Sequence, residues 1–171
     1  DQLIKLEPEN IDLFSQRAMC ETKSRGLEVY RERCREAIKR FVTPEASIQD
    51  KRGVADMCCR VANAVDDTGA IVELAREIVA ANPPPAVKNK KILAMALLED
   101  GQADAALPLL LEIESESNLN RGMFLFKLAR AYHATGQADV AADWLDQGDA
   151  WTAERLAEAD FPYLNFPLVV Q

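Results

Sequence analysis

Cysteine and histidine, the residue types that most often carry out chemistry, are few in this chain. Its 171 residues include one histidine, His133, and four cysteines, which are Cys20, Cys34, Cys58 and Cys59. A zinc site needs four converging Cys or His ligands at characteristic spacings, and the sequence holds no Cys-x-x-Cys pair. A nucleophilic site needs a base and a third, orienting group. We therefore expect no metal, no cofactor and no enzymatic activity.

The cysteines have a simpler interpretation. All four lie in helical patterns among apolar neighbours, where a free thiol usually acts as a small core residue. The adjacent pair Cys58 and Cys59 could instead be a redox pair, although neighbouring residues on a helix point in different directions. Free core thiols are typical of a reducing compartment, so we expect a cytoplasmic protein.

The motif Gly-Gln-Ala-Asp occurs twice, and its aspartates could act as paired carboxylates. It begins at Gly101 and again at Gly136, 35 residues later, so the aspartates are Asp104 and Asp139. Each copy joins two apolar stretches, which indicates a helix, a tight turn and a second helix. The glycine favours the turn, and the aspartate favours the next helix start through capping and the helix dipole.

The repeat argues against catalysis by these aspartates. Equivalent positions of stacked hairpins lie about 20 Å apart, whereas the two carboxylates of a glycosidase lie about 5 to 9 Å apart. We expect both aspartates to be helix caps.

Composition and charge narrow the class of protein further. Hydrophobic residues make up 49% of the chain and charged residues 28%, as in a folded globular protein. The net charge of −8 argues against non-specific nucleic-acid binding, which needs an excess of Lys and Arg. No apolar run reaches the 18 residues of a membrane span.

The two motif copies resemble the tetratricopeptide repeat, whose period is about 34 residues. In that family, small and large residues alternate so that two antiparallel helices pack closely. The matching residues of the later copy are Leu128, Ala129, Tyr132, Ala141 and Leu145, and those of the earlier copy are Leu93, Ala94, Leu97, Ala106 and Leu110. Two weaker copies lie upstream, one with its turn at Gly69 and one in which Tyr30 stands where a small residue is expected.

The resemblance implies an all-α fold, a right-handed superhelix of about four helical hairpins in a single repeat domain, 1–171. The expected hairpins are 11–43, 46–83, 87–116 and 121–150. Residues 1–7 are expected to end a preceding repeat, and 151–171 to form a C-terminal helix and stub. We expect a fragment of a longer protein. Residues 60–151 resemble the C-terminal repeats of large bacterial proteins that also carry a serine/threonine kinase or a WD-repeat propeller.

The family resemblance also implies a concave groove lined by the first helix of each pair. Carried over position by position, the groove residues are Arg60, Asn63, Lys88, Lys91, Phe126, Lys127, Arg130 and His133. Most of them are cationic although the chain is acidic. Lys88 and Lys91 open a helix, where the dipole disfavours positive charge. Two interpretations remain open: an anionic partner, or a solvated face paired with nearby glutamates.

These observations favour a non-catalytic scaffold that binds a protein or peptide, which could be acidic, in a locally basic groove. The alternative is a self-assembly module that forms homo-oligomers through its uncapped ends. The segment after Gly136 is strongly acidic, and Trp144 and Trp151 share a face if one helix runs through Gly148. We expect both tryptophans to pack against the next helix. No nucleic acid or membrane is expected as a partner.

Overall fold

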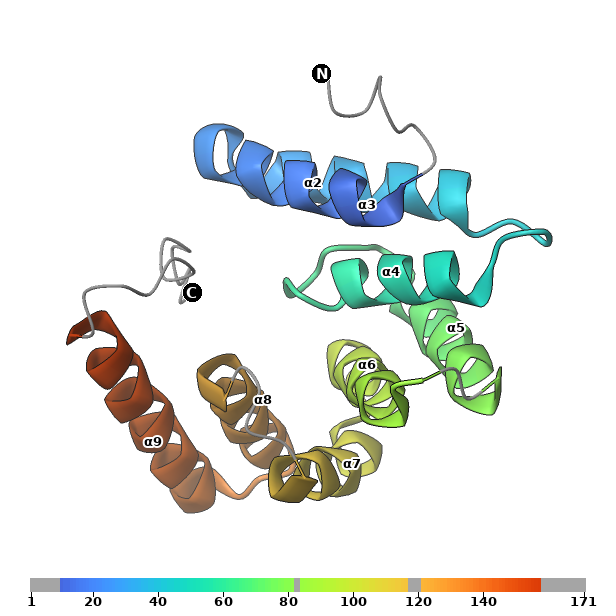
Figure 1. The fold of residues 1–171 in the computed structure, drawn as a ribbon. Helices are drawn as coiled ribbons and strands as arrows, with labels where there is room; N and C mark the ends of the chain where they lie inside the picture. The colour runs from blue at the N-terminus through green and yellow to red at the C-terminus, as the bar shows by residue number, and fades with distance from the viewer. Residues whose placement is uncertain (1–9, 82–83, 117–120, 158–171) are drawn as a thin grey trace. The chain divides into compact units, whose positions relative to one another are not determined.

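The computed structural model describes residues 10–81, 84–116 and 121–157, and every regular element in these ranges is an α-helix (Figure 1). The helices are α2 (Ile11–Arg25), α3 (Leu27–Phe41), α4 (Ile48–Cys58), α5 (Thr68–Ala81), α6 (Ala86–Glu99), α7 (Ala103–Glu116), α8 (Arg121–Ala134) and α9 (Ala138–Ala157). The predicted all-α class is confirmed. The predicted tail at 1–7 and the part of the predicted stub at 158–171 lie outside the described residues.

The helices form two compact units divided between Asp100 and Gly101. The first unit contains α2 to α6 and the second contains α7 to α9. Each predicted hairpin range contains two helices, but the division falls inside the third range, between α6 and α7. The superhelix of four stacked hairpins therefore stays a prediction, and each unit is described by itself.

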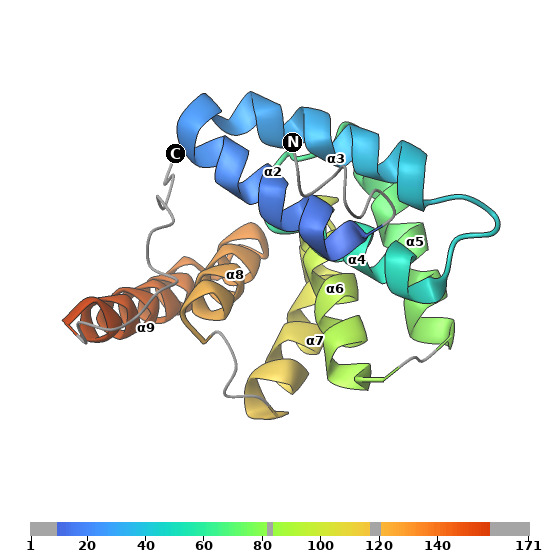
Figure 2. The same ribbon diagram turned by 45° about the horizontal axis from the view of Figure 1, so that its top comes forward.

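Helix α4 is central to the first unit. It packs against α2, α3, α5 and α6, and Figures 1 and 2 show it between α2 and α6. The core consists mainly of apolar side chains such as Phe14, Val54 and Ile78. Helices α2 and α4 approach closely at Gly53, because a Cβ added there would lie 2.8 Å from the Ile11 side chain. A glycine is thus needed at this crossing.

In the second unit, α8 packs against both α7 and α9. Gly148 of α9 is buried against Phe126 of α8, and an added Cβ would lie 2.8 Å from the phenyl ring. Tyr132 of α8 stacks on Trp144 of α9, with ring centroids 6.4 Å apart and planes 10° apart. The ring of Trp144 therefore packs against the preceding helix, whereas the sequence analysis expected the next one.

The two Gly-Gln-Ala-Asp turns form as the sequence predicts. Gly101 and Gly136 both have a φ of +77°, the left-handed conformation that favours glycine. After Gly136, the N–H of Gln137 donates to the Tyr132 carbonyl at 2.9 Å, a bond characteristic of a Schellman helix end. The aspartates are not the capping residues, because α7 and α9 begin one residue before each of them. They lie in the first turn, where the helix dipole favours negative charge.

The second hairpin differs from its prediction. Gly69 lies inside the first turn of α5, and Asp67 caps this helix by accepting the N–H of Ala70 at 3.0 Å. The left-handed residue in this connection is Asn63, with a φ of +55°. Helix α4 ends at Cys58, so the connection is longer than those at Gly101 and Gly136. The predicted turn at Gly69 is wrong, and this error displaced the expected position of the first helix of the second hairpin.

The fourth hairpin also departs from its expected bounds. Helix α9 continues without a break from Ala138 to Ala157, so the predicted second helix and the start of the C-terminal helix are one element. Leu145, which the repeat pattern assigns to the core, has 47% of its surface exposed. Leu128 and Ala141 are buried as the pattern predicts.

Three of the four cysteines are core residues, as expected. Cys34, Cys58 and Cys59 are buried, whereas Cys20 is exposed on α2, which corrects that prediction. A hydrogen bond with the Cys34 thiol, together with burial, raises the pKa of Cys58 well above its ordinary value. The Cys58 thiol of α4 thus meets the Cys34 thiol of α3 in the core.

Candidate functional site

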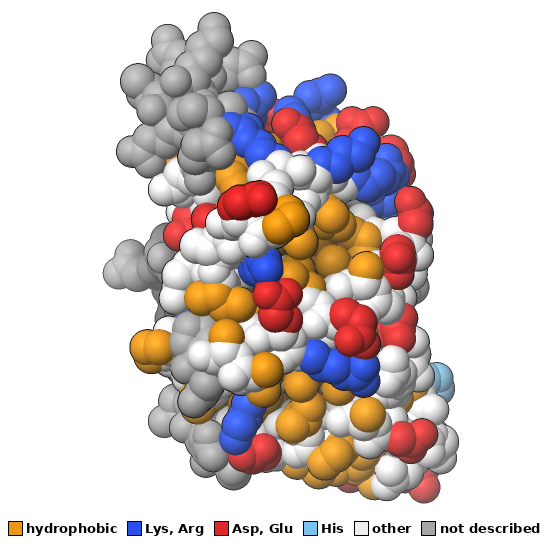
Figure 3. Space-filling model, turned by 90° about the vertical axis from the view of Figure 1, so that its right-hand side faces the viewer, with side chains coloured by type: hydrophobic (Ala, Val, Ile, Leu, Met, Phe, Trp, Pro, Cys, Tyr) orange, Lys and Arg blue, Asp and Glu red, His pale blue; other side chains and the backbone are white. Residues whose placement is uncertain are grey.

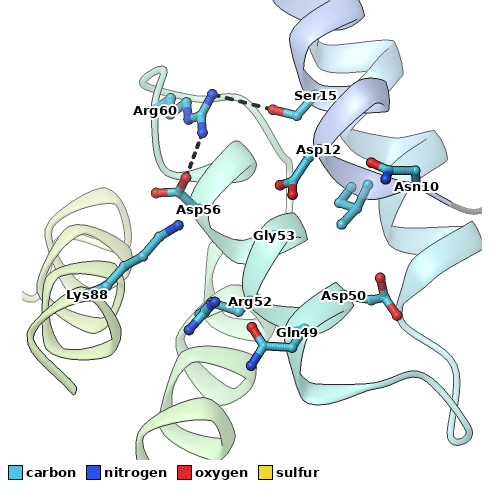
Figure 4. A pocket seen from close by; sticks show the side chains of 11 residues that line it. Asn10, Asp12, Ser15, Gln49, Asp50, Arg52, Gly53, Asp56, Arg60 and Lys88 are labelled. Atoms are coloured by element: carbon cyan, nitrogen blue, oxygen red, sulfur yellow. Dashed lines mark hydrogen bonds and ion pairs between the residues drawn. The ribbon is translucent and has the colours of Figure 1, made fainter. Parts of the chain in front are cut away.

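Charged side chains of both signs cover the surface of the first hairpin, at the top of the face in Figure 3. Below this hairpin, the first unit contains an open hollow of about 500 Å³ between α2, α4 and α6 (Figure 4). The residues that line it are Asn10, Ile11, Asp12, Ser15, Gln49, Asp50, Arg52, Gly53, Asp56, Arg60 and Lys88. Because three helices of the first unit converge on it, this hollow is the first unit's candidate binding site.

Helix α4 presents one of its faces to the hollow. Its lining residues Gln49, Arg52, Gly53 and Asp56 recur at helical spacing, which brings them to the same side. The start of α4 is set by Ser47, whose hydroxyl accepts the N–H of Asp50 at 3.1 Å. Such caps fix where each helix begins and therefore which face meets the hollow.

Helix α2 forms the opposite wall. It begins after Asn10, whose side-chain oxygen accepts the N–H of Leu13 at 2.9 Å. This start places Asp12 and Ser15 on the wall, with Asp12 exposed and Ser15 buried. Ile11 and Gly53 both line the hollow, and their close approach brings α2 and α4 together beside it.

An ion pair closes one end of the hollow. Arg60 lies just after α4, and its guanidinium is 2.6 Å from the Asp56 carboxylate and 3.4 Å from the Ser15 hydroxyl (Figure 4). Burial by itself would lower the pKa of Arg60, but the Asp56 carboxylate outweighs burial and the pKa is raised. The guanidinium stays charged and holds α2 to the end of α4.

The remaining charges do not make the hollow basic. The lining contains three carboxylates, those of Asp12, Asp50 and Asp56, and three cations, those of Arg52, Arg60 and Lys88. Arg52 donates to the Pro84 carbonyl at 2.9 Å, and Asp50 accepts from the Ser47 hydroxyl at 2.6 Å. The hollow is thus polar and charge-balanced, whereas the sequence analysis expected an excess of cations.

Of the eight predicted groove residues, the structure brings Arg60 and Lys88 together at this hollow. Arg60 follows α4 and does not lie on it, contrary to the expected helix position. Asn63 is exposed in the α4–α5 connection, where its carbonyl accepts from Arg31 at 3.0 Å. Lys91 is half-buried on α6 and is not part of the lining.

The other four predicted residues belong to α8 in the second unit. Phe126 packs against Gly148 of α9, so that side of its ring is not available to a ligand. Lys127 is buried, with only 9% of its surface exposed. Arg130 is half-buried, and His133 is exposed in the last helical turn. The prediction of one groove shared by all eight residues is therefore not supported by their positions within the two units.

Most of the lining was missed because the second hairpin was aligned on Gly69. With α4 at its true position, the spacing of Gln49, Arg52 and Asp56 would have predicted a polar helix face. Asp12 and Ser15 could be recognised as a polar side of α2, three residues apart. Whether these two faces point at each other depends on how the helices pack. The sequence pattern carries no information about that packing.

Comparison with known proteins adds no identification, since the chain matches no family model, no curated protein and no solved structure. Within the described residues, no group of three or more His, Cys, Asp or Glu side chains is arranged to hold a metal ion. None of the described helices has the length and apolar character to cross a membrane. The function must be argued from the hollow itself.

Proposed function

We propose that this chain is a non-catalytic protein-interaction module whose hollow between α2, α4 and α6 binds a short segment of a partner protein. The observation that carries the proposal is that three helices of the first unit line one hollow of about 500 Å³. Ligand sites in proteins typically have volumes of about 300 to 1,000 Å³. The resemblance to tetratricopeptide repeats agrees with an α-helical scaffold, and the free buried thiols of Cys34, Cys58 and Cys59 agree with a cytoplasmic location.

The side chains that line the hollow are better suited to binding a peptide than to catalysing a reaction. Gln49 is exposed at the rim, and its amide can both donate to and accept from a peptide backbone. The lining residues include neither Cys nor His, and the Ser15 hydroxyl is engaged by Arg60. These features favour recognition over nucleophilic chemistry.

Selection from a random peptide library displayed on phage tests this proposal. The 171-residue chain would be immobilised, and selected peptides would be synthesised and their affinities measured by fluorescence anisotropy. Gln49→Trp places an indole at the rim of the hollow, and we expect it to weaken binding at least about tenfold, or 1.4 kcal/mol. Ala80→Trp adds the same group at an exposed position on α5 outside the lining, and we expect less than about a twofold change.

Two results would contradict the proposal. One is a selection that yields no binding peptide. The other is a set of peptides whose affinity for the chain is the same with Gln49→Trp as with Ala80→Trp. Circular dichroism of both variants ensures that lost binding does not reflect lost helix.

A second candidate function is self-assembly through α9. This helix exposes two large apolar side chains, Leu145 with 47% and Val140 with 37% of its surface accessible, which a second copy of the chain could cover. Light scattering at several concentrations should then show a mass that rises with concentration. Leu145→Glu should keep the chain monomeric, whereas Ala150→Glu, also exposed on α9, serves as the matched control. A monomer at every concentration would eliminate this candidate.

A further inference from the structure

The charges around the hollow are separated by sign. Figure 4 shows the carboxylates of Asp12 and Asp50 toward the α2 side, and the cationic groups of Arg52 and Lys88 toward the α6 side. Asp56 and Arg60 pair with each other at 2.6 Å and so largely cancel. The hollow therefore has one acidic edge and one basic edge.

Two of these charges are available to a ligand. Asp12 and Lys88 are both exposed, and among the described residues neither has an ion-pair partner within 4.0 Å. Asp12 is in the first turn of α2, where the helix dipole stabilises negative charge. Lys88 is in the first turn of α6, where the dipole disfavours positive charge. The helix dipole thus accounts for a negative charge at Asp12, whereas it does not account for a positive charge at Lys88.

We infer that the segment bound in the hollow carries charges of both signs in a fixed order along its chain. A Lys or Arg side chain would lie against Asp12 and Asp50, and a carboxylate would lie against Lys88 and Arg52. This inference rests on the proposed function and specifies its ligand. A uniformly acidic segment would meet repulsion from Asp12 and Asp50, which separates this ligand from the acidic peptide that a basic groove would bind.

The width of the hollow sets the spacing of the ligand's charges. Helices α2 and α6 lie on either side of α4, and packed helices are separated by about 8 to 10 Å. The axes of α2 and α6 are therefore at most about 20 Å apart, and the side chains of Asp12 and Lys88 reach inward from them (Figure 4). An extended peptide advances about 3.3 Å per residue, so the basic and acidic side chains should be no more than about six residues apart.

The sequences of peptides selected by display test the inference directly. With the wild-type chain, we expect selected dodecapeptides to carry a basic and an acidic residue in one fixed order, no more than about six positions apart. Asp12→Lys should shift the selection toward acidic peptides, and Lys88→Asp toward basic ones. The double variant Asp12→Lys, Lys88→Asp should lose the preferred order of charges, because each edge then holds one charge of each sign.

A matched control separates local recognition from net charge. Glu73→Lys is exposed on α5 outside the lining and changes the net charge by the same amount as Asp12→Lys. We expect it to leave the selected sequences unchanged. Asp12→Asn, which removes the charge and adds no lysine to the helix start, should lose the preference for a basic residue while the chain stays folded.

The outcomes distinguish this inference from the proposed function. The inference would be overturned, and the peptide-binding function would stand, if Gln49→Trp weakens binding but the selected peptides are uncharged, wholly acidic or without a fixed order of charges. Peptides that are insensitive to Gln49→Trp, or the absence of any selected peptide, would overturn both. A charge order that persists unchanged in the double variant would also overturn the inference.

Discussion

The first and fourth hairpins each consist of two consecutive helices, α2 with α3 and α8 with α9, but different contacts hold the two helices of each pair together. Helices α2 and α3 are joined by the edge-on contact of Phe14 with Phe41 and, in addition, by an ion-pair network. The centre of this network is Glu21, which lies 2.7 Å from Arg17 and 2.8 Å from Arg33. Arg33 also pairs with Glu36 at 2.6 Å. Helices α8 and α9 are joined by the fit of Phe126 against Gly148 and by the stacking of two aromatic rings.

The difference explains why only one of these hairpins has a clear repeat pattern. Close packing of α8 on α9 requires small residues opposite large ones, and that alternation is visible in the sequence. The first hairpin replaces part of it with charged contacts and with Tyr30, which occupies a position where a small residue was expected. The Tyr30 side chain is fully buried, and its hydroxyl donates to the Met57 carbonyl at 2.7 Å. A helical pair can therefore be specified by charge and hydrogen bonding where its apolar pattern is weak.

The largest expected effect tests the close packing of the fourth hairpin. Gly148→Ala places a methyl group 2.8 Å from the Phe126 ring, so we expect the free energy of unfolding to fall by about 2 kcal/mol. Gly69→Ala is the matched control, because its added Cβ meets only ordinary contacts of 3.5 Å or more. In that helix, the substitution should stabilise the chain by about 0.5 kcal/mol. Urea denaturation measures both, and equal signs would show that the α8–α9 contact is not tight.

The next effect tests the ion pairs of the first hairpin. Hydrogen bonds from Arg33 and Arg17 lower the pKa of Glu21 from 4.5 to about 2 in the folded chain. Since the folded pKa is the lower one, this group's stabilisation is complete above pH 4.5 and is lost as the pH falls toward 2. Glu21→Gln should cost about 1.5 kcal/mol at pH 7 and weaken the loss of stability in that pH range.

Glu32→Gln provides the control for this prediction, because Glu32 is exposed on the same hairpin and the substitution is identical. Denaturation curves between pH 2 and pH 7 measure all three proteins. If Glu21→Gln and Glu32→Gln have the same effect at pH 7, the network does not stabilise the hairpin.

The smallest effect compares a tyrosine from each hairpin. Tyr30→Phe removes the buried hydrogen bond to the Met57 carbonyl, so we expect a loss of about 1 kcal/mol in the free energy of unfolding. Tyr132→Phe keeps the ring that stacks on Trp144 and should change stability by less than about 0.5 kcal/mol. Similar losses in thermal or urea denaturation would mean that the Tyr30 hydroxyl does not join α3 to α4.

Local rules of the chain allowed much of the helical arrangement to be predicted. The glycines at 101 and 136 adopt the left-handed conformation because a Cβ would be strained there, and this requirement is a property of the residue itself. The same reasoning failed at Gly69, because Asn63 adopts the left-handed conformation in that hairpin. A turn residue other than glycine leaves a weaker pattern, and the error moved the expected first helix away from Gln49 and Arg52.

The sequence by itself therefore determined the all-helical class, two of the turns and the alternation of small and large residues in the later helices, since these depend on neighbours along the chain. Only the tertiary structure decided that Asp12, Arg52 and Lys88 surround one hollow, and that Lys127 is buried instead of lining a groove. The physical reason is that convergence of side chains from three helices depends on how those helices cross. At α2 and α4 that crossing is set by the contact between Gly53 and Ile11, which are 42 residues apart in the chain.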